Sequence, residues 1–105
     1  MPREQFQTLS EPMYYVLLTL IKECCGIDIM NKVADISKGR VLVGPGTVYA
    51  MLDKFLKNGV IKETAYQGRK RSYIITAYGK VLLQAEHSRL QALVADGENI
   101  LEDVI

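Results

Sequence analysis

The chain has 105 residues, of which 49% are hydrophobic and 24% charged, so it fits one domain with a modest core. No apolar run approaches the roughly 20 residues that a membrane-spanning helix needs, and we expect no membrane segment. The first residues lack the basic-then-apolar order of a secretory signal, so we expect a cytoplasmic protein.

The net charge is only +1, but it is unevenly distributed along the chain. Between Lys38 and Arg71 there are eight basic and two acidic residues, a local charge of +6, so the flanking segments sum to −5. A neutral protein with a basic middle is typical of a localised surface that binds a polyanion.

The first two predicted elements are amphipathic helices. Ser10 is a good helix cap and Pro12 is tolerated in a first turn, so a helix is expected from about Glu11 to Glu23, with apolar residues three and four apart. A second amphipathic helix is expected over residues 27–37, and Gly39 is a plausible stop.

Two adjacent cysteines, Cys24 and Cys25, lie between these helices. Their spacing gives neither a disulfide framework nor the Cys-x-x-Cys pattern of a zinc or redox site. We expect them to be buried as small apolar residues at a helix end; a redox-sensing or intermolecular thiol is the alternative.

A third helix follows the sequence Gly44-Pro45-Gly46 and is expected to end near Asn58-Gly59, with Thr47 near its cap. A nucleotide-binding loop would need a following Lys or a third Gly, and the segment has neither. Third in the order of elements, this helix takes the position of the recognition helix in a winged helix-turn-helix, whose first residues enter the DNA major groove.

The residues predicted to contact DNA lie on the side of this helix opposite its apolar face. Backbone amides at Gly46 would approach phosphate, polar side chains would read bases, and lysines would neutralise phosphate. An ordinary solvated face for the lysines, and half-burial of the tyrosine against the second helix, are the alternatives. The side chains are Thr47, Tyr49, Lys54 and Lys57.

Residues 60–76 are rich in Val, Ile, Thr and Tyr and are divided by Gln67-Gly68, which predicts two strands around a turn. The turn carries Arg69, Lys70 and Arg71, flanked by Tyr66 and Tyr73. We predict a basic wing that lies along the phosphate backbone or in the minor groove, rather than a hairpin that is charged only for solubility.

The last predicted element is a long helix that begins after Thr76, runs to about Asp96 and resumes beyond Gly97. Its apolar stripe predicts a dimer interface, with packing back onto its own domain as the alternative. The predicted interface residues are Leu83, Leu90, Leu93 and Val94.

The single histidine, His87, lies near this stripe without a metal-binding or catalytic partner set. We therefore expect no metal site, no cofactor and no enzyme activity. The predicted fold class is mainly α with a small β-hairpin, a winged helix-turn-helix plus a long C-terminal dimerisation helix.

Four segments in this order resemble the PadR family of bacterial transcriptional regulators: SEPMYYVLLTL, CGIDIMNKV, VGPGTVYAMLDKFLKNGVI and GRKRSYIITAYGK. The resemblance covers about residues 9–83. The short tail after Tyr78 is similar to that of the compact subfamily with one C-terminal helix. It implies a homodimeric repressor with a winged helix-turn-helix over residues 1–76 and a dimerisation helix over residues 77–105, together one structural unit.

A two-fold symmetric dimer would bind a palindromic double-stranded operator, because its recognition helices would meet half-sites about one helical turn apart. Some compact members of the family bind planar aromatic inducers between tryptophans at the dimer interface. This chain contains no Trp, so an equivalent pocket for a small-molecule inducer would be lined by Leu, Met or Tyr. The alternative function is a winged-helix protein interaction module that does not bind DNA.

Overall fold

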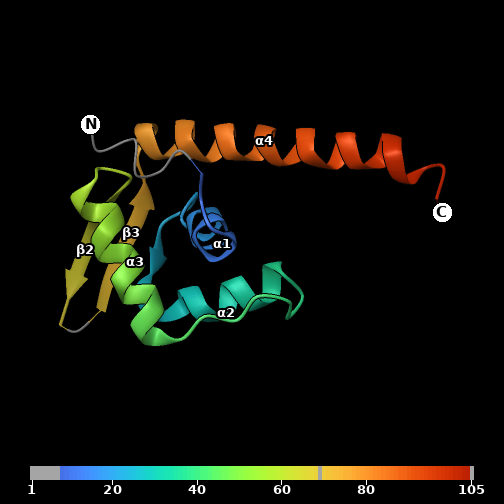
Figure 1. Ribbon diagram of the computed structural model, residues 1–105. Coiled ribbons are helices and arrows are strands. Elements are labelled where there is room, and N and C mark those ends of the chain that lie inside the picture. The colour runs from blue at the N-terminus through green and yellow to red at the C-terminus, as the bar shows by residue number, and fades with distance from the viewer. Residues whose placement is uncertain (1–7, 69, 105) are drawn as a thin grey trace.

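The computed structural model describes residues 8–68 and 70–104 of the chain. These residues form four helices and a three-stranded sheet, with the last helix running along one side and projecting beyond the other elements (Figure 1). This architecture confirms the predicted winged helix-turn-helix with a long C-terminal helix. The elements are α1 (Glu11–Thr19), β1 (Cys24–Cys25), α2 (Gly26–Ile36), α3 (Pro45–Lys57), β2 (Ile61–Gln67), β3 (Lys70–Ile75) and α4 (Ala77–Leu101).

The first helix begins where the sequence predicts but ends four residues early. The Ser10 hydroxyl accepts a hydrogen bond from the Met13 amide at 3.3 Å, as expected of a cap. The helix ends at Thr19 rather than Glu23, because Leu20 leaves helical geometry and its carbonyl accepts the Ile75 amide at 2.8 Å. A hydrogen bond with a distant strand therefore overrides the local apolar pattern.

The two cysteines form a short strand that the sequence pattern does not predict. Cys24 lies opposite Tyr73 and Cys25 opposite Ser72, so β1 pairs antiparallel with β3 and the sheet order is β1-β3-β2. The cysteines therefore do not end the first helix, although Cys25 is the cap residue directly before α2. Cys24 is buried, as expected, and this burial raises the pKa of its thiol.

The connection from α2 to α3 is fixed by a buried serine. Ser37 is fully buried, and its hydroxyl accepts the Val41 amide at 3.0 Å and lies 3.2 Å from the Val41 carbonyl. Gly39 has a φ of +79° and donates its amide to the Ala34 carbonyl at 2.8 Å, which confirms it as the stop after α2.

The third helix starts earlier than Thr47. Gly44 is the cap residue and Pro45 the first helical residue, so Thr47 lies inside the first turn and does not cap the helix. Pro45 fits there because a first-turn residue needs no amide hydrogen and because its fixed φ suits a helix. The buried face of α3 carries Val48, Leu52 and Phe55, which pack into the core between the helices and the sheet.

The final helix is continuous from Ala77 to Leu101, so the expected interruption at Gly97 is wrong. A single interior glycine costs about 1 kcal/mol relative to alanine, which is too little to break a long helix. At the other end, the Thr76 hydroxyl accepts the Gly79 amide at 3.0 Å and donates toward the Gly59 carbonyl at 2.7 Å. Thr76 therefore caps α4 and also ties it to the turn between α3 and β2.

Candidate nucleic-acid interface

The exposed side of α3 carries one polar stripe. Thr47, Ala50, Lys54 and Lys57 are all exposed and follow one another at spacings of three, four and three residues, which places them on one line along a helix. From Thr47 to Lys57 the stripe is about 15 Å long at the usual rise per residue. A stripe of this length, with a hydroxyl at one end and ammonium groups toward the other, suits bases at one end and phosphates at the other.

The beginning of α3 leaves its first-turn amides accessible. Its cap residue, Gly44, has no side chain, and its carbonyl accepts the Val48 amide at 3.0 Å. A Cβ atom added at Gly44 or Gly46 would meet nothing within 4 Å, so the fold itself does not require glycine at either position. Amides at an open helix start can bind phosphate oxygens.

Tyr49 lies away from this stripe, at the edge of α3 that faces α2. It is 44% exposed, and a Cβ atom at Gly26 would be 3.2 Å from its Cε1 atom and 3.4 Å from its hydroxyl. Gly26 therefore makes room for the Tyr49 ring at the start of α2. Tyr49 is thus half-buried against the second helix, as the alternative expected, while its exposed part leaves the predicted base contact open to test.

An acidic residue accompanies the lysines of the stripe. The Lys57 Nζ atom is 3.1 Å from Asp53 Oδ2, and both side chains are more than half exposed. An exposed ion pair one turn apart on a helix contributes about 0.5 kcal/mol or less, so it can open to let Lys57 reach a phosphate. Lys54 is exposed on the same stripe.

The two long strands form the wing, and a bulge decides which of its side chains share a face. Glu63 lies opposite Tyr73 whereas Ala65 lies opposite Ser72, so Thr64 is an extra residue in β2. The Thr64 hydroxyl donates a hydrogen bond to a carboxylate oxygen of Glu23, just before β1.

Beyond the bulge, Tyr66 lies opposite Arg71. Arg71 is two residues from the buried Tyr73, so Arg71 and Tyr66 extend the face of the sheet that packs on the helices, while Lys70 lies on the other face. Tyr66, Lys70 and Arg71 are exposed, whereas the predicted flanking aromatic Tyr73 is not available to DNA. Arg69 lies outside the described residues.

Arg71 is held by neighbours on that face. Its guanidinium carbon lies 4.9 Å from the centroid of the Tyr66 ring, and its Nε atom lies 3.6 Å from Glu63 Oε2. The Tyr66 hydroxyl first, and then the Glu63 carboxylate, raise the pKa of Arg71 because both favour its protonated form. Glu63 could not be assigned to this site from the sequence, because only the bulged register shows that it shares a face with Arg71.

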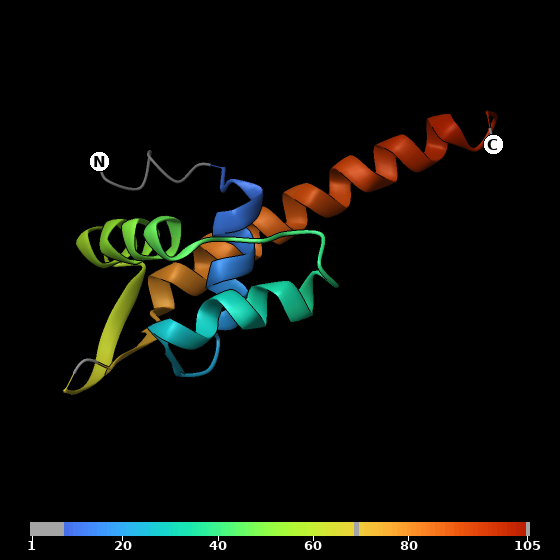
Figure 2. The same ribbon diagram turned by 90° about the horizontal axis from the view of Figure 1, so that it is seen from below.

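The wing and α3 lie at one end of the molecule, and the far end of α4 lies at the other (Figure 2). The turn between the strands contains Gly68 with a φ of +59°, in agreement with the predicted need for positive φ. Helix α3, which carries Thr47, Lys54 and Lys57, therefore lies at the same end of the molecule as the wing, which carries Lys70 and Arg71.

The predicted interface residues on α4 divide into two groups. Leu83 is 6% exposed and packs in the core of its own chain, so its side chain is not available to a partner. Leu90 is half-buried, whereas Leu93 and Val94 are 53% and 60% exposed. Only the last three residues therefore remain candidates for contact with a second chain.

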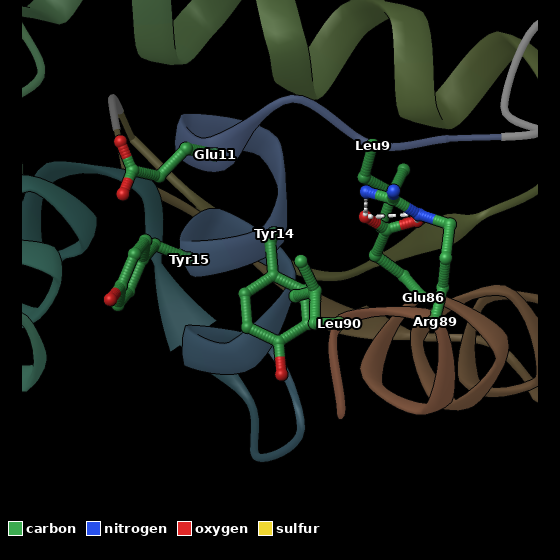
Figure 3. Close-up of a pocket in the computed structure, with 7 residues that line it drawn as sticks. All are labelled: Leu9, Glu11, Tyr14, Tyr15, Glu86, Arg89 and Leu90. Atoms are coloured by element: carbon green, nitrogen blue, oxygen red, sulfur yellow. Dashed lines mark hydrogen bonds and ion pairs between the residues drawn. The ribbon is translucent and has the colours of Figure 1, made fainter. Parts of the chain in front are cut away.

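A hollow of about 300 Å³ lies between the start of α1 and the middle of α4 (Figure 3). Glu86 is buried at its edge and accepts hydrogen bonds from the Arg89 guanidinium, including one from Nε at 3.1 Å. These bonds lower the pKa of the Glu86 carboxyl, and the Leu9 amide also contributes. The hollow is lined by Leu9, Glu11, Tyr14, Tyr15, Glu86, Arg89 and Leu90.

Within the described part of the chain, no helix is long and apolar enough to cross a membrane. No cluster of three or more His, Cys, Asp or Glu side chains in that same part could hold a metal ion.

Solved structures with a similar fold include two that are described as transcription regulators. A PadR family transcription regulator from hypervirulent Clostridium difficile is 17% identical with a TM-score of 0.68, over 85% of this chain and 97% of that chain. A transcriptional regulator from Clostridium thermocellum is 21% identical with a TM-score of 0.66, over 85% and 96% of the two chains. RosR of H. salinarum is 18% identical with a TM-score of 0.63, over 89% and 96%.

Identities this low establish a common fold alone, and no curated protein matches the chain. Residues 16–85 match the transcriptional regulator PadR-like family, and this match covers α2, α3, the whole sheet and parts of α1 and α4. Members of the family are transcriptional regulators and not enzymes. The chain therefore belongs to the PadR-like family of transcriptional regulators.

Proposed function

We propose that this regulator is a cytoplasmic homodimeric repressor of a neighbouring operon and that it binds a palindromic double-stranded operator. The observation that carries the proposal is the position of the polar stripe of α3 and the basic wing at one end, with the exposed half of α4 at the other (Figure 2). In this proposal residues 1–76 bind DNA and residues 77–105 hold the dimer together.

The DNA contacts divide between bases and backbone. The amides of Gly46 and Thr47 at the open start of α3 bind phosphate, while the Thr47 hydroxyl and the exposed edge of Tyr49 contact bases in the major groove. The cations on α3 and the wing neutralise phosphates. They are Lys54, Lys57, Arg69, Lys70 and Arg71.

Dimerisation uses the part of α4 that its own chain leaves uncovered. The line of α4 that is buried at Gly79, Leu83 and Glu86 continues, at the same spacings of three and four residues, through Leu90 and Val94. A second copy related by a two-fold axis would cover this continuation and the neighbouring Leu93. The interface would then be formed by the same surface on both chains.

A small hydrophobic or aromatic inducer at the dimer interface is part of the proposal. The hollow between α1 and α4 supports it, because Leu90 both lines this hollow and belongs to the predicted interface. Tyr14 and Leu90 line it, and in the view of Figure 3 the Glu86–Arg89 pair lies to one side of them. Apolar walls with a few polar groups are typical of small-molecule sites. A ligand there would press on α1 and α4 together and release the DNA by moving the two recognition helices relative to each other.

The test is binding of the purified protein to the DNA upstream of its gene during a salt titration. We expect the logarithm of the binding constant to fall linearly with the logarithm of salt concentration, by about 0.9 per phosphate contact. Lys54→Gln should lower the slope by about one contact per protomer, whereas Lys80→Gln at the start of α4 should leave it unchanged. Changes at Thr47 should instead alter sequence preference.

Two results would contradict the proposal. Affinity that does not change between low and moderate salt would exclude phosphate contacts. Absence of any complex with duplex DNA at low salt would favour the protein interaction module instead. Sedimentation at several protein concentrations would test the dimer separately, since a species that remains a monomer throughout would exclude it.

A further inference from the structure

An acidic side chain lies inside the basic wing, next to the arginine that would bind phosphate. Glu63 Oε2 is 3.6 Å from Arg71 Nε, and the Arg71 and Glu63 side chains are 53% and 35% exposed. Glu63 is opposite Tyr73, two residues from Arg71, so the pair lies diagonally across two strands on one face. The proposed DNA contacts do not use this carboxylate.

The bulge at Thr64 determines which side chains of β2 lie on the same face as Arg71. Counted back from the Tyr66–Arg71 pair, an unbroken register would place Thr64 opposite Tyr73 and Glu63 on the other face, but the extra residue moves Glu63 to the position opposite Tyr73. The Tyr66 ring then covers one face of the guanidinium while Glu63 lies beside its Nε atom. A phosphate that approaches Arg71 therefore meets a cation that already has an anionic neighbour.

We infer that Glu63 competes with DNA phosphate for Arg71 and is a positioning residue that lowers the affinity of the wing for non-operator DNA. The inference rests on the proposed DNA-binding function. Non-operator binding consists of phosphate contacts, so weakening one of them on each wing lowers its affinity directly. On an operator, base contacts from α3 fix the position of the protein, which holds a phosphate beside Arg71 long enough to replace the carboxylate.

The experiment compares wild type with Glu63→Gln on a non-operator duplex and on the upstream DNA, each over a range of salt concentrations. Because the substitution removes an exposed ion pair and frees Arg71 for phosphate, non-operator affinity should rise about two- to fivefold per protomer. The salt dependence should become steeper by about 0.9 per protomer, equal to one additional phosphate contact. Affinity for the operator should rise less, so the ratio of operator to non-operator affinity should fall.

Two controls separate competition for Arg71 from general charge repulsion. In an Arg71→Ala background, Glu63→Gln should change non-operator affinity by less than about twofold, because the shared cation is absent. Asp35→Asn removes the same charge from the last turn of α2, at the end of that helix that points away from the wing, and should have no effect (Figure 1). An equal gain in the Arg71→Ala background, or with Asp35→Asn, would overturn the inference.

Thermal unfolding of each variant would verify that the fold is intact, which is expected because both side chains are at the surface. Equal affinity and equal salt dependence of wild type and Glu63→Gln on non-operator DNA would overturn this inference and leave the proposed function in place. Failure of the wild-type protein to bind any DNA would overturn both.

Discussion

The two halves of α4 belong to one continuous helix, yet they have different surroundings. In the first half Gly79, Leu83 and Glu86 are buried against the rest of the chain. In the second half Leu93 and Val94 are exposed to solvent. Apolar residues occur in both halves, so composition does not distinguish them. The difference lies in packing: the first half packs against the rest of the chain, whereas the second half extends beyond it.

The largest difference between the halves is expected for leucine truncation. Leu83→Ala should lower the free energy of unfolding by about 2–5 kcal/mol, because it leaves a cavity in the core. Leu93→Ala should change the folding of a single chain by about 0.5 kcal/mol or less. Urea denaturation measures both. Any greater destabilisation in Leu93→Ala should depend on protein concentration, as partner binding requires.

Equal, concentration-independent destabilisation by these two substitutions would mean that the second half of α4 is packed like the first. That result would remove the distinction between the halves. It would also remove the support for dimerisation through Leu93.

Two glycines allow the same substitution to be made in each half. A Cβ atom at Gly79 would lie 2.2 Å from the Val60 carbonyl oxygen, so Gly79→Ala should force α4 away from the α3–β2 turn and cost about 1–3 kcal/mol. A Cβ atom at Gly97 would meet nothing within 4 Å, and Gly97→Ala should raise stability by up to about 1 kcal/mol. Thermal unfolding should therefore show shifts of opposite sign, and a stabilising Gly79→Ala would show that the first turn of α4 is not fixed.

The smallest expected effect concerns the buried carboxylate. Arg89, and then the Leu9 amide, lower the pKa of Glu86 from the ordinary 4.5. The ionised Glu86 therefore stabilises the folded protein fully above pH 4.5, and this stabilisation is lost as the pH falls through the lower pKa of the folded state. Glu86→Gln should cost about 1 kcal/mol at neutral pH, a value reduced because Arg89 is partly exposed.

Denaturation at several pH values measures this effect, and the Glu86→Gln protein should lose less stability than wild type below about pH 4.5. Glu98→Gln changes an exposed glutamate in the second half and should follow the wild-type pH dependence. Identical pH profiles for wild type and Glu86→Gln would contradict the role of the Glu86–Arg89 pair.

The features that the sequence predicted are those set by local chemistry. Ser10 and Thr76 cap their helices, Gly39 and Gly68 take positive φ, and the apolar spacing places Val48 and Phe55 in the core. Each of these depends on a few neighbouring residues. Local patterns were therefore enough to predict the order of three helices, a hairpin and a final helix.

The features that the sequence did not predict depend on interactions between distant segments. Helix α1 ends at Thr19 because the Leu20 carbonyl accepts a hydrogen bond from Ile75 of β3. Cys24 is part of a strand because it pairs with Tyr73 of β3. The Glu63–Arg71 pair needs the bulged register of the wing. In contrast, the spacing of Glu86 and Arg89, three residues apart on a helix, could have indicated their ion pair in advance.

The contact between the first turn of α4 and the turn after α3 has a mechanical consequence. With 25 residues at about 1.5 Å each, α4 is a lever of about 37 Å. A tilt of about 5° at its first turn would carry its far end through about 3 Å over that length. In such a tilt Thr76 and Gly79 would form the pivot, because both lie against the turn that follows α3. Force applied at the far end of such a lever would be multiplied at α3, the helix proposed to contact DNA.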